Sequence, residues 1–377
     1  MGLFSKAAPP QSYLGVDIGY GGIKLVELKN EKGRARLVTY AYANAASESL
    51  EQSLLQDIPY TADLLKKMLA KAKTTTKKTI SALPVSAVFS SILSVPTTNE
   101  KELKAAIEAQ AKKLIPIPIE EVVLDNKILD KKEGMKLGVK KETSDKDKRN
   151  KKAEKEEGKK GPKGMTRVLV TAAPKTLIAK YQEVMKLAGL ELAFLETEAF
   201  AEIRSLIGKD RSTIMIIDMG ALRSNIFIVE NGVPFITRSI AAGGNAITQT
   251  IAKTLGIPME QAETMKRDIK SMQTFAPTGD LTPILRVLVK PILDEVKYSF
   301  NQYQSQGANQ KRIEKIILTG GASLLPRLPE FLTQEMNVNT YLGNPWARVV
   351  YPPDLRPVID EIGPRFAVSI GCAMRDI

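Results

Sequence analysis

Histidine is absent from the 377-residue sequence, and cysteine occurs once, at Cys372. Without histidine the chain has no Ser-His-Asp triad and no histidine metal ligand. Any catalysis must therefore use carboxylates, lysine, backbone amides or a hard cation. A single cysteine excludes a disulfide within the chain and a Cys-x-x-Cys zinc site, and it fits a reducing compartment.

Long hydrophobic runs are also missing. No apolar stretch approaches the ~20 residues that a membrane-spanning helix needs, and the first residues lack a signal-peptide hydrophobic region. We therefore expect the protein to be cytoplasmic. Aromatic residues are sparse, at 6%, which argues against the stacking platforms of a nucleic-acid binder.

The net charge of +13 is concentrated in one segment. Residues 131–164 hold 14 Lys/Arg and 7 Asp/Glu, a net of +7, which leaves +6 for the rest of the chain. Because the segment has almost no large apolar residues after Val139, we predict a disordered loop. We favour a solubilising linker, and the alternative is a tether to anionic lipid headgroups.

Two stretches, 201 positions apart, share one pattern: an apolar run, an aspartate, a turn of small residues and a second apolar run. They begin at Asp17 and Asp218, and each predicts a strand–turn–strand hairpin. Small residues let backbone amides converge on phosphate oxygens. The predicted phosphate-binding residues are Gly19, Tyr20, Gly21, Gly22 and Lys24 in the first stretch, and Gly220, Ala221, Leu222, Ser224 and Asn225 in the second. Both aspartates suit a hydrated Mg²⁺.

Three further segments complete the pattern. A strand over 234–239 leads into Gly243, Gly244 and Asn245. An apolar strand over 313–319 runs into Gly320, Gly321, Ala322 and Ser323, a turn that allows close approach to a flat nucleoside. The remaining pair, Glu263 and Lys266, has the spacing of an ordinary surface ion pair on a helix.

Periodicity predicts the surrounding elements. Strands are expected over 13–43, with a turn near Asn30, and over 79–83, 88–95, 122–129 and 167–172, the last two pairing across the basic loop. Helices are expected over 61–73, from a capping box at Thr97 and Glu100 to Leu114, over 175–187, and over 281–305 with a bend near Pro291.

In this order the segments resemble the actin/Hsp70/sugar-kinase ATPase superfamily, whose connecting segments would lie around Glu198 and near Gly371. The resemblance implies an α/β, actin-like (ribonuclease H-like) duplicated ATPase fold with a nucleotide cleft between two lobes. It implies ATP and Mg²⁺ as ligands, with Asp17 and Asp218 on the hydrated metal. Glu198 would orient the attacking water, and Glu263 and Lys266 would contact the ribose and base.

The segment Leu114–Asp125 is similar to the PilM family, cytoplasmic actin-like proteins of type IV pilus and type II secretion-like inner-membrane platforms. The resemblance runs from about Ser12 to Asp376, except for 131–164. It implies binding of the N-terminal cytoplasmic peptide of a PilN-like bitopic membrane protein, in a groove that would involve residues 79–129. It further implies contact with other pilus platform proteins and peripheral membrane association through partners, and it leaves self-association open.

The implied domain plan has a first lobe over 12–211 with an FtsA-type inserted subdomain over about 84–172, and a second lobe over 212–377 with a helical insertion over about 245–312. Residues of about 360–377 would pack back on the first lobe.

Three positions depart from the family: Gly22 replaces a common Ser, Ser224 or Asn225 a usual Thr, and Ala199 a frequent Pro. They favour nucleotide binding over efficient hydrolysis, at most a weak ATPase. The alternatives are an FtsA-like filament protein, for which the C-terminal residues show no amphipathic anchor, and a sugar or acetate kinase.

Overall fold

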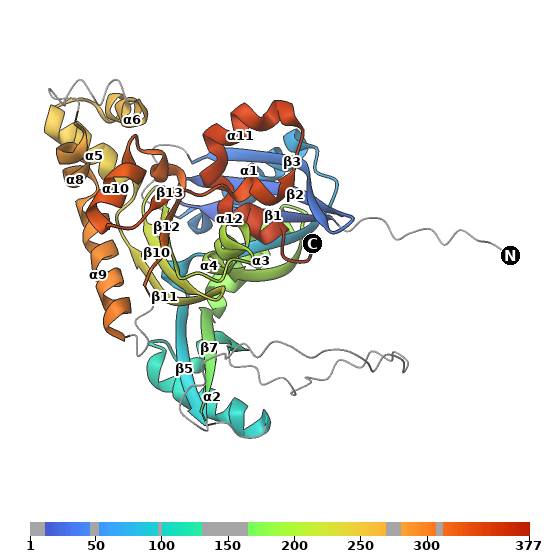
Figure 1. Cartoon of the computed structure of the whole chain (residues 1–377). Coiled ribbons are helices and arrows are strands. Elements are labelled where there is room, and N and C mark those ends of the chain that lie inside the picture. Colours follow the sequence, from blue (N-terminus) through green and yellow to red (C-terminus); the bar gives the residue numbers. More distant parts are fainter. Residues whose placement is uncertain (1–11, 46–52, 97–99, 130–164, 269–279, 307–311) are drawn as a thin grey trace, which may run out of the picture. The chain divides into compact units, whose positions relative to one another are not determined.

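The computed structural model describes residues 12–45, 53–96, 100–129, 165–268, 280–306 and 312–377 (Figure 1). The basic segment 131–164 and the expected helix cap at Thr97 lie outside the described residues. The chain divides into two compact units: unit 1 is Met1–Val88 with Thr176–Ile377, and unit 2 is Phe89–Lys175. In the described part of the chain, every helix is too short or too polar to cross a membrane.

The first sheet of unit 1 is built around the hairpin that begins at residue 12. Its six strands lie in the order β14 (Val349–Val350), β3 (Arg34–Asn44), β2 (Gly22–Glu31), β1 (Ser12–Gly19), β4 (Lys78–Leu83) and β8 (Glu191–Thr197). β1 and β2 are antiparallel, with Asp17 opposite Lys24, and β4 runs parallel to β1. The turn expected near Asn30 is confirmed, because the Asn30 side chain accepts a hydrogen bond from Gly33 N.

The second sheet of unit 1 repeats this plan. Its five strands lie in the order β11 (Val233–Ile240), β10 (Ser224–Glu230), β9 (Ile214–Met219), β12 (Lys315–Thr319) and β13 (Thr340–Leu342). β9 and β10 form an antiparallel hairpin with Asp218 opposite Asn225, and β12 runs parallel to β9 with Thr319 beside Asp218. In both sheets a hairpin is thus followed by a strand parallel to its first member, which places both aspartates at equivalent strand ends.

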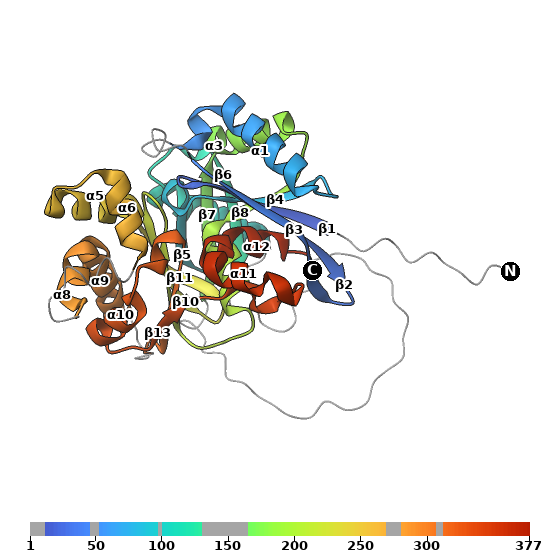
Figure 2. The ribbon, with the colours of Figure 1, turned by 90° about the horizontal axis from the view of Figure 1, so that it is seen from above.

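Helices of unit 1 surround the two sheets (Figures 1 and 2). They are α1 (Ile58–Ala72), α3 (Lys175–Leu187), α4 (Glu198–Glu202), α5 (Gly244–Leu255), α6 (Met259–Arg267), α8 (Thr282–Leu288), α9 (Lys290–Gln306), α10 (Leu328–Met336), α11 (Arg356–Ile362) and α12 (Ala367–Ala373). α12 packs on β1 and β2, so the C-terminal segment covers the first sheet. α4 continues into a π-helical turn, Ile203–Ile207.

Two helix boundaries differ from the sequence-based expectation. α1 begins three residues before Thr61, because the Asp57 side chain accepts a hydrogen bond from Tyr60 N at 2.9 Å and a proline occupies the first turn. The helix expected over 281–305 is two helices, separated at Val289. Pro291 follows in the first turn of α9, where its missing N–H is tolerated, whereas inside one continuous helix its ring would clash with the preceding turn.

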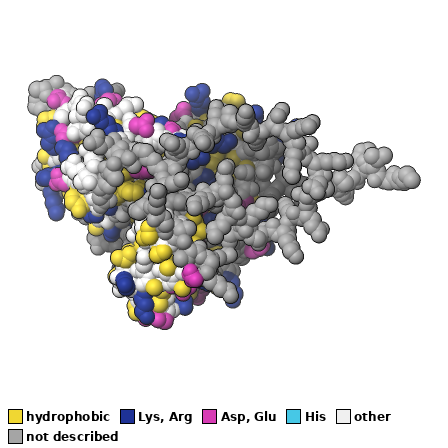
Figure 3. Space-filling view, turned by 60° about the horizontal axis from the view of Figure 1, so that its bottom comes forward, with side chains coloured by type: hydrophobic (Ala, Val, Ile, Leu, Met, Phe, Trp, Pro, Cys, Tyr) yellow, Lys and Arg dark blue, Asp and Glu magenta, His cyan; other side chains and the backbone are white. Residues whose placement is uncertain are grey.

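Unit 2 is a three-stranded antiparallel sheet in the order β5 (Phe89–Pro96), β7 (Met165–Pro174) and β6 (Val122–Ile128). The pairing of β6 with β7 confirms the expected connection across the basic segment. α2 (Glu100–Leu114) packs on β5 and β7, and its buried Leu103 and Ile107 join Val95 and Val168 in a separate hydrophobic core. Figure 3 shows apolar side chains exposed among lysines and arginines on the face that it presents; in unit 2, Leu114 is an exposed apolar residue.

Candidate nucleotide site

The first hairpin presents an aspartate and a lysine at its closed end. Asp17 is 8% exposed, and its Oδ2 lies 3.3 Å from Nζ of Lys24 on the neighbouring strand. The turn between them requires glycine at Gly22, whose φ is +132° and whose Cβ would collide with the carbonyl of Ala43. β1, β2 and the turn therefore hold one charge pair beside the backbone of the glycine turn.

The second hairpin is linked to α4 through one amide side chain. Asn225 Nδ2 donates to Asp218 Oδ2 at 3.1 Å and to Glu198 Oε2 at 3.3 Å. Glu198 Oε2 also accepts from the backbone N–H of Val85 at 3.0 Å. The predicted metal aspartate and the predicted water-orienting glutamate thus share one hydrogen-bond network.

The two glycine turns meet. A Cβ built on Gly21 would lie 3.0 Å from the Cβ of Ala221. The segment after β11 supports the second turn, because Gly244 N donates to Gly220 O at 2.9 Å and Asn245 N to Ala221 O at 2.8 Å. The structure therefore brings together the two predicted phosphate-binding turns and the predicted cofactor-binding segment Gly243, Gly244 and Asn245.

The predicted nucleoside side adjoins these turns. Gly320 has φ +83°, and a Cβ there would collide with the Asp218 side chain. A Cβ on Gly244 would lie 3.3 Å from that of Ala322 and 3.5 Å from Nζ of Lys266. Lys266 Nζ donates to Gly244 O at 3.2 Å and to Glu263 Oε2 at 2.5 Å, so this pair is tied to the site and is more than an exposed surface pair.

Burial and mutual repulsion dominate the electrostatics of the carboxyl groups. Burial raises the pKa of Glu198 to about 8, and the neighbouring charges of Asp218 and Asp17 add to the rise. Burial, with the charge of Asp17, raises the pKa of Asp218 to about 6, although Lys24 opposes the shift. Glu198 therefore keeps its proton to a higher pH than Asp218 does.

Sequence reasoning missed Glu202, which lies one helical turn after Glu198. Its side chain is 0% exposed, and neither oxygen accepts a hydrogen bond from the described part of the chain. Burial raises its pKa well above the ordinary value, and its protonated carboxyl interacts with Asp218. The i, i+4 spacing of the two glutamates was the available signal.

Two predicted hydroxyl ligands have partners within the protein. Ser224 is buried and donates to Ala242 O at 2.6 Å. Ser323 is also buried and donates to Gly320 O at 2.7 Å. In this arrangement both hydroxyls hold the loops that carry the backbone amides. Tyr20, Leu222, Gly243 and Gly321 lie within the turns themselves.

The carboxylates suit a hydrated cation better than a bare one. The described residues contain no group of three or more His, Cys, Asp or Glu side chains arranged to hold a metal. Asp17 and Asp218 repel each other electrostatically at the phosphate-binding turns, and Mg²⁺ typically keeps several waters beside one or two carboxylates and phosphate oxygens. The donor set therefore fits Mg²⁺ held mainly through water.

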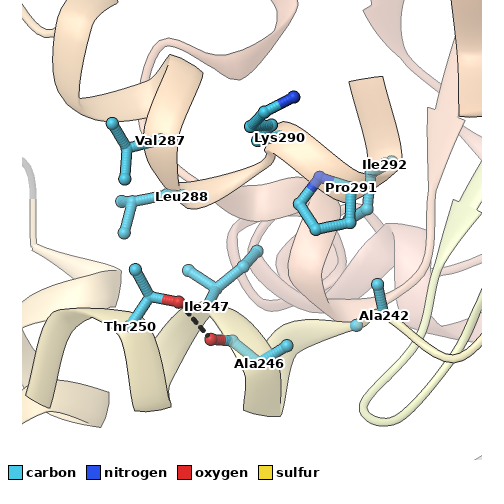
Figure 4. Close-up of a pocket in the computed structure, with 10 residues that line it drawn as sticks. Ala242, Ala246, Ile247, Thr250, Val287, Leu288, Lys290, Pro291 and Ile292 are labelled. Carbon is cyan, nitrogen blue, oxygen red and sulfur yellow. Dashed lines mark hydrogen bonds between the residues drawn. The ribbon is translucent and has the colours of Figure 1, made fainter. Parts of the chain in front are cut away.

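A separate pocket is lined by residues of α5, α8 and α9 and by Ala242 and Gly243 before α5 (Figure 4). Ala246, Ile247 and Thr250 of α5 face Val287, Leu288 and the Lys290–Ile292 segment of α8 and α9 across it. Of the predicted site residues only Gly243 lines this pocket, and its walls carry no carboxylate. It is therefore distinct from the site where the turns converge.

Comparison with known proteins agrees with this geometry. The family model "Type IV pilus assembly protein PilM" matches residues 15–140 and 156–377. A solved chain of a "PilM-PilN type IV pilus biogenesis complex" superposes with a TM-score of 0.76 and 25% identity, covering 97% of this chain and 99% of that chain. The ethanolamine utilization protein EutJ from Carboxydothermus hydrogenoformans superposes with a TM-score of 0.53 at 16% identity, over 97% and 90% of the two chains.

Curated relatives at lower identity are cell division proteins FtsA. The protein from Neisseria meningitidis is 23% identical over 55% of this chain and 53% of its own length, so the match spans about half of that relative. The protein from Streptococcus pneumoniae is 21% identical over 88% of this chain and 75% of its own.

The duplicated hairpin-plus-parallel-strand sheets and their facing glycine turns define a protein of the actin-like ATPase fold, as the sequence predicted. Within that class, the chain belongs to the family of the type IV pilus assembly protein PilM. The PilM resemblance carried by the sequence is thereby confirmed.

Proposed function

We propose that the protein binds ATP with Mg²⁺ where the two glycine turns meet, and that the nucleotide sets the closure of the two lobes. The observation that carries this proposal is the convergence of independently predicted segments: Gly21 with Ala221, Gly244 with Gly220, and Lys266 with Gly244. Backbone amides from two hairpins would bind the phosphates, and Lys24 would add a point charge. Mg²⁺, when bound, would neutralise phosphate charge between Asp17 and Asp218.

The same geometry supports slow hydrolysis. Glu198 is held by hydrogen bonds from Val85 N and Asn225 Nδ2, and from this fixed position it would orient an attacking water. In the cation-free protein, burial and the charges of Asp218 and Asp17 raise the pKa of Glu198, and a carboxyl that keeps its proton is a poor general base. Binding energy would therefore serve conformational switching more than turnover.

Similarity to the solved PilM–PilN chain over 97% of this sequence supports a PilN-like partner. We propose that the partner segment is the N-terminal cytoplasmic peptide of such a bitopic membrane protein, and that it binds in a groove that involves residues 79–129. The protein would then work at the inner face of the cytoplasmic membrane, as a component of a pilus assembly platform.

A pull-down tests the two parts of this proposal separately. The full chain is incubated with an immobilised N-terminal peptide of the PilN-like protein, with a scrambled peptide as control, in the presence and absence of ATP and Mg²⁺. We expect specific capture that changes several-fold with nucleotide. Asp218→Ala should lose the nucleotide effect while retaining peptide capture. Equal capture by the scrambled peptide would refute the partner, and nucleotide-independent capture would refute the switch.

A further inference from the structure

Arg223 lies in the second glycine turn, one residue before β10, and its guanidinium reaches the edge strand of the same sheet. Nε of Arg223 donates to Oγ of Ser239 at 3.0 Å, and Nη2 donates to the backbone oxygen of the same serine at 3.3 Å. Ser239 belongs to β11, whose register places it opposite Asn225 of β10. The arginine of the turn is therefore tied to the strand that pairs with the site.

This contact sets the direction of a chain of hydrogen bonds. A guanidinium can only donate, so Ser239 Oγ accepts from Arg223 and gives its single proton to Asn225. The distance from Ser239 Oγ to Asn225 Oδ1 is 2.7 Å, so the carbonyl end of the asparagine side chain is fixed on the serine. The amide end points the other way, and there Nδ2 donates to Asp218 Oδ2 at 3.1 Å and to Glu198 Oε2 at 3.3 Å.

The opposite orientation of the Asn225 side chain would be costly. A half-turn of the amide would place Oδ1 against oxygens of Asp218 and Glu198, so that acceptors would face acceptors and both carboxyl groups would lose a donor. Asn225 is 7% exposed, and water replaces a lost partner poorly at such a site. The chain that starts at Arg223 therefore selects the one orientation that both carboxyl groups can use.

Asp218 depends on this orientation more than Glu198 does. Glu198 Oε2 accepts a second hydrogen bond, from the backbone N–H of Val85 at 3.0 Å, which holds that carboxyl group even if the amide turns. Asp218 lies at the end of β9, directly opposite Asn225 in the hairpin. Carboxylates that serve a metal ion are oriented by hydrogen bonds from neighbouring groups. Loss of the chain should therefore act first on the binding that depends on the cation.

We infer that Arg223 and Ser239 are positioning residues of the nucleotide site and act through Asn225. They fix its amide so that it holds Asp218 and Glu198 in the arrangement that receives hydrated Mg²⁺ together with the nucleotide. The inference rests on the proposed ATP site and adds the residues that orient its carboxyl groups. Since the phosphates are assigned to backbone amides and to lysine, the chain serves the cation and leaves direct phosphate contacts untouched.

The test substitutes Ser239, which carries no charge and lies outside the glycine turns. Loss of Arg223 would also remove a positive charge from a phosphate-binding turn. ATP affinity of the full chain is measured by calorimetry in Mg²⁺ and, separately, in EDTA. We expect Ser239→Ala to weaken ATP binding about tenfold in Mg²⁺ and to leave binding in EDTA unchanged. Ser239→Thr keeps the hydroxyl and should bind ATP like the wild type.

A double-mutant cycle shows whether Ser239 acts through Asn225. In the Asn225→Ala background, Ser239→Ala should cause no further change of ATP affinity in Mg²⁺, because the amide that the serine orients is gone. Thr237→Ala is the matched control, since Thr237 lies two residues earlier on the same face of β11. It should bind ATP like the wild type in both solutions.

Wild-type ATP affinity in Ser239→Ala would overturn the inference, and so would an equal loss in EDTA, which indicates a structural role for this serine in β11. Equal losses in Ser239→Thr and Ser239→Ala would overturn it too, as would a full Ser239→Ala effect in the Asn225→Ala background. If Ser239→Ala does not fold, Ser239→Cys replaces it, because a thiol is a weak donor, and wild-type affinity in Mg²⁺ would then overturn the inference. Failure of the wild-type chain to bind ATP would instead refute the proposed function.

Discussion

Glu198, Glu202 and Asp218 form a cluster of carboxyl groups whose proton affinities depend on one another, and Glu202 is the fully buried member of the three. The charge of Asp218 raises the pKa of both glutamates, after burial, which is the larger cause. Asp17 adds to the repulsion, whereas Lys24 and Asn225 stabilise the ionised form of Asp218. Without a bound cation, protonation of the carboxyl groups relieves this repulsion. The free energy of unfolding therefore depends on pH.

We expect Glu198→Gln to flatten the pH dependence of stability of the nucleotide-free protein. The folded-state pKa of Glu198, about 8, exceeds its ordinary value of 4.5, so the folded state binds the proton more tightly than the unfolded state. Its contribution is fully present below pH ~4.5 and is lost as pH rises through ~8. Gln mimics the protonated form, so the Tm of the variant should exceed that of the wild type by a few degrees at pH 8.5 and match it at pH 5.

Differential scanning fluorimetry from pH 5 to 8.5 measures this effect. Glu330→Gln is the control, because Glu330 is an exposed partner of Arg327 at 3.5 Å, and its Tm profile should follow that of the wild type. Parallel profiles for Glu198→Gln and the wild type would show that the Glu198 carboxyl is not destabilising when ionised.

At the scale of elements, the close contact between the start of α5 and the second glycine turn positions the phosphate-binding amides. We expect Gly243→Ala to break this contact, because its Cβ would lie 2.6 Å from Ala221 O and 2.7 Å from Gly220 O. Overpacking of this kind costs roughly 1–3 kcal/mol. The variant should unfold at lower denaturant concentration and bind ATP at least tenfold more weakly.

Gly256→Ala, at the other end of α5, separates local strain from loss of the site. Gly256 has φ +63° with no atom within 4 Å of an added Cβ, so the substitution costs only the left-handed conformation, roughly 1 kcal/mol. It should lower stability without changing ATP affinity. Equal ATP affinity in Gly243→Ala and the wild type would contradict the positioning role of this contact.

The elements of the site were predictable from sequence where a local pattern determines them. The apolar runs on both sides of Asp17 and Asp218 predict the hairpins, because in each stretch an aspartate and a turn of small residues separate the two runs. The contacts of Ser239 and Glu202 were not predictable in this way, since they arise from the register of β11 on β10 and from the burial of α4. The direction of the Ser224 hydroxyl depends likewise on strand register.

The break between α8 and α9 shows the same limit. Pro291 predicts a disturbed helix, but whether the helix bends or breaks depends on tertiary packing. Here Leu288, Val289 and Ile292, around the break, are buried. The break also leaves Val287 and Lys290 at the pocket of Figure 4. The sequence therefore predicts a disturbance at Pro291 but not the pocket beside it.

At the scale of the whole molecule, units 1 and 2 have separate hydrophobic cores. Among the described residues, the buried core cluster of unit 2 runs from Leu93 to Ala172, whereas the predicted ATP ligands all belong to unit 1. Ligand binding stabilises the structure that holds the ligand by RT ln(1 + [L]/Kd), or ~2.7 kcal/mol at 100 times Kd. Nucleotide should therefore stabilise the two units unequally.

Hydrogen–deuterium exchange of the full chain checks this expectation. With ATP and Mg²⁺ at about 100 times Kd, core amides of β9 (Ile214–Met219) that exchange through global opening of unit 1 should slow by about a hundredfold. Core amides of β7 (Met165–Pro174) should keep their rates. Asp218→Ala provides the control, since it should lose the slowing in unit 1 without altering unit 2. Equal slowing in β7 would show that the two units unfold as one, and that the nucleotide acts on the inserted unit through shared stability as well as through lobe closure.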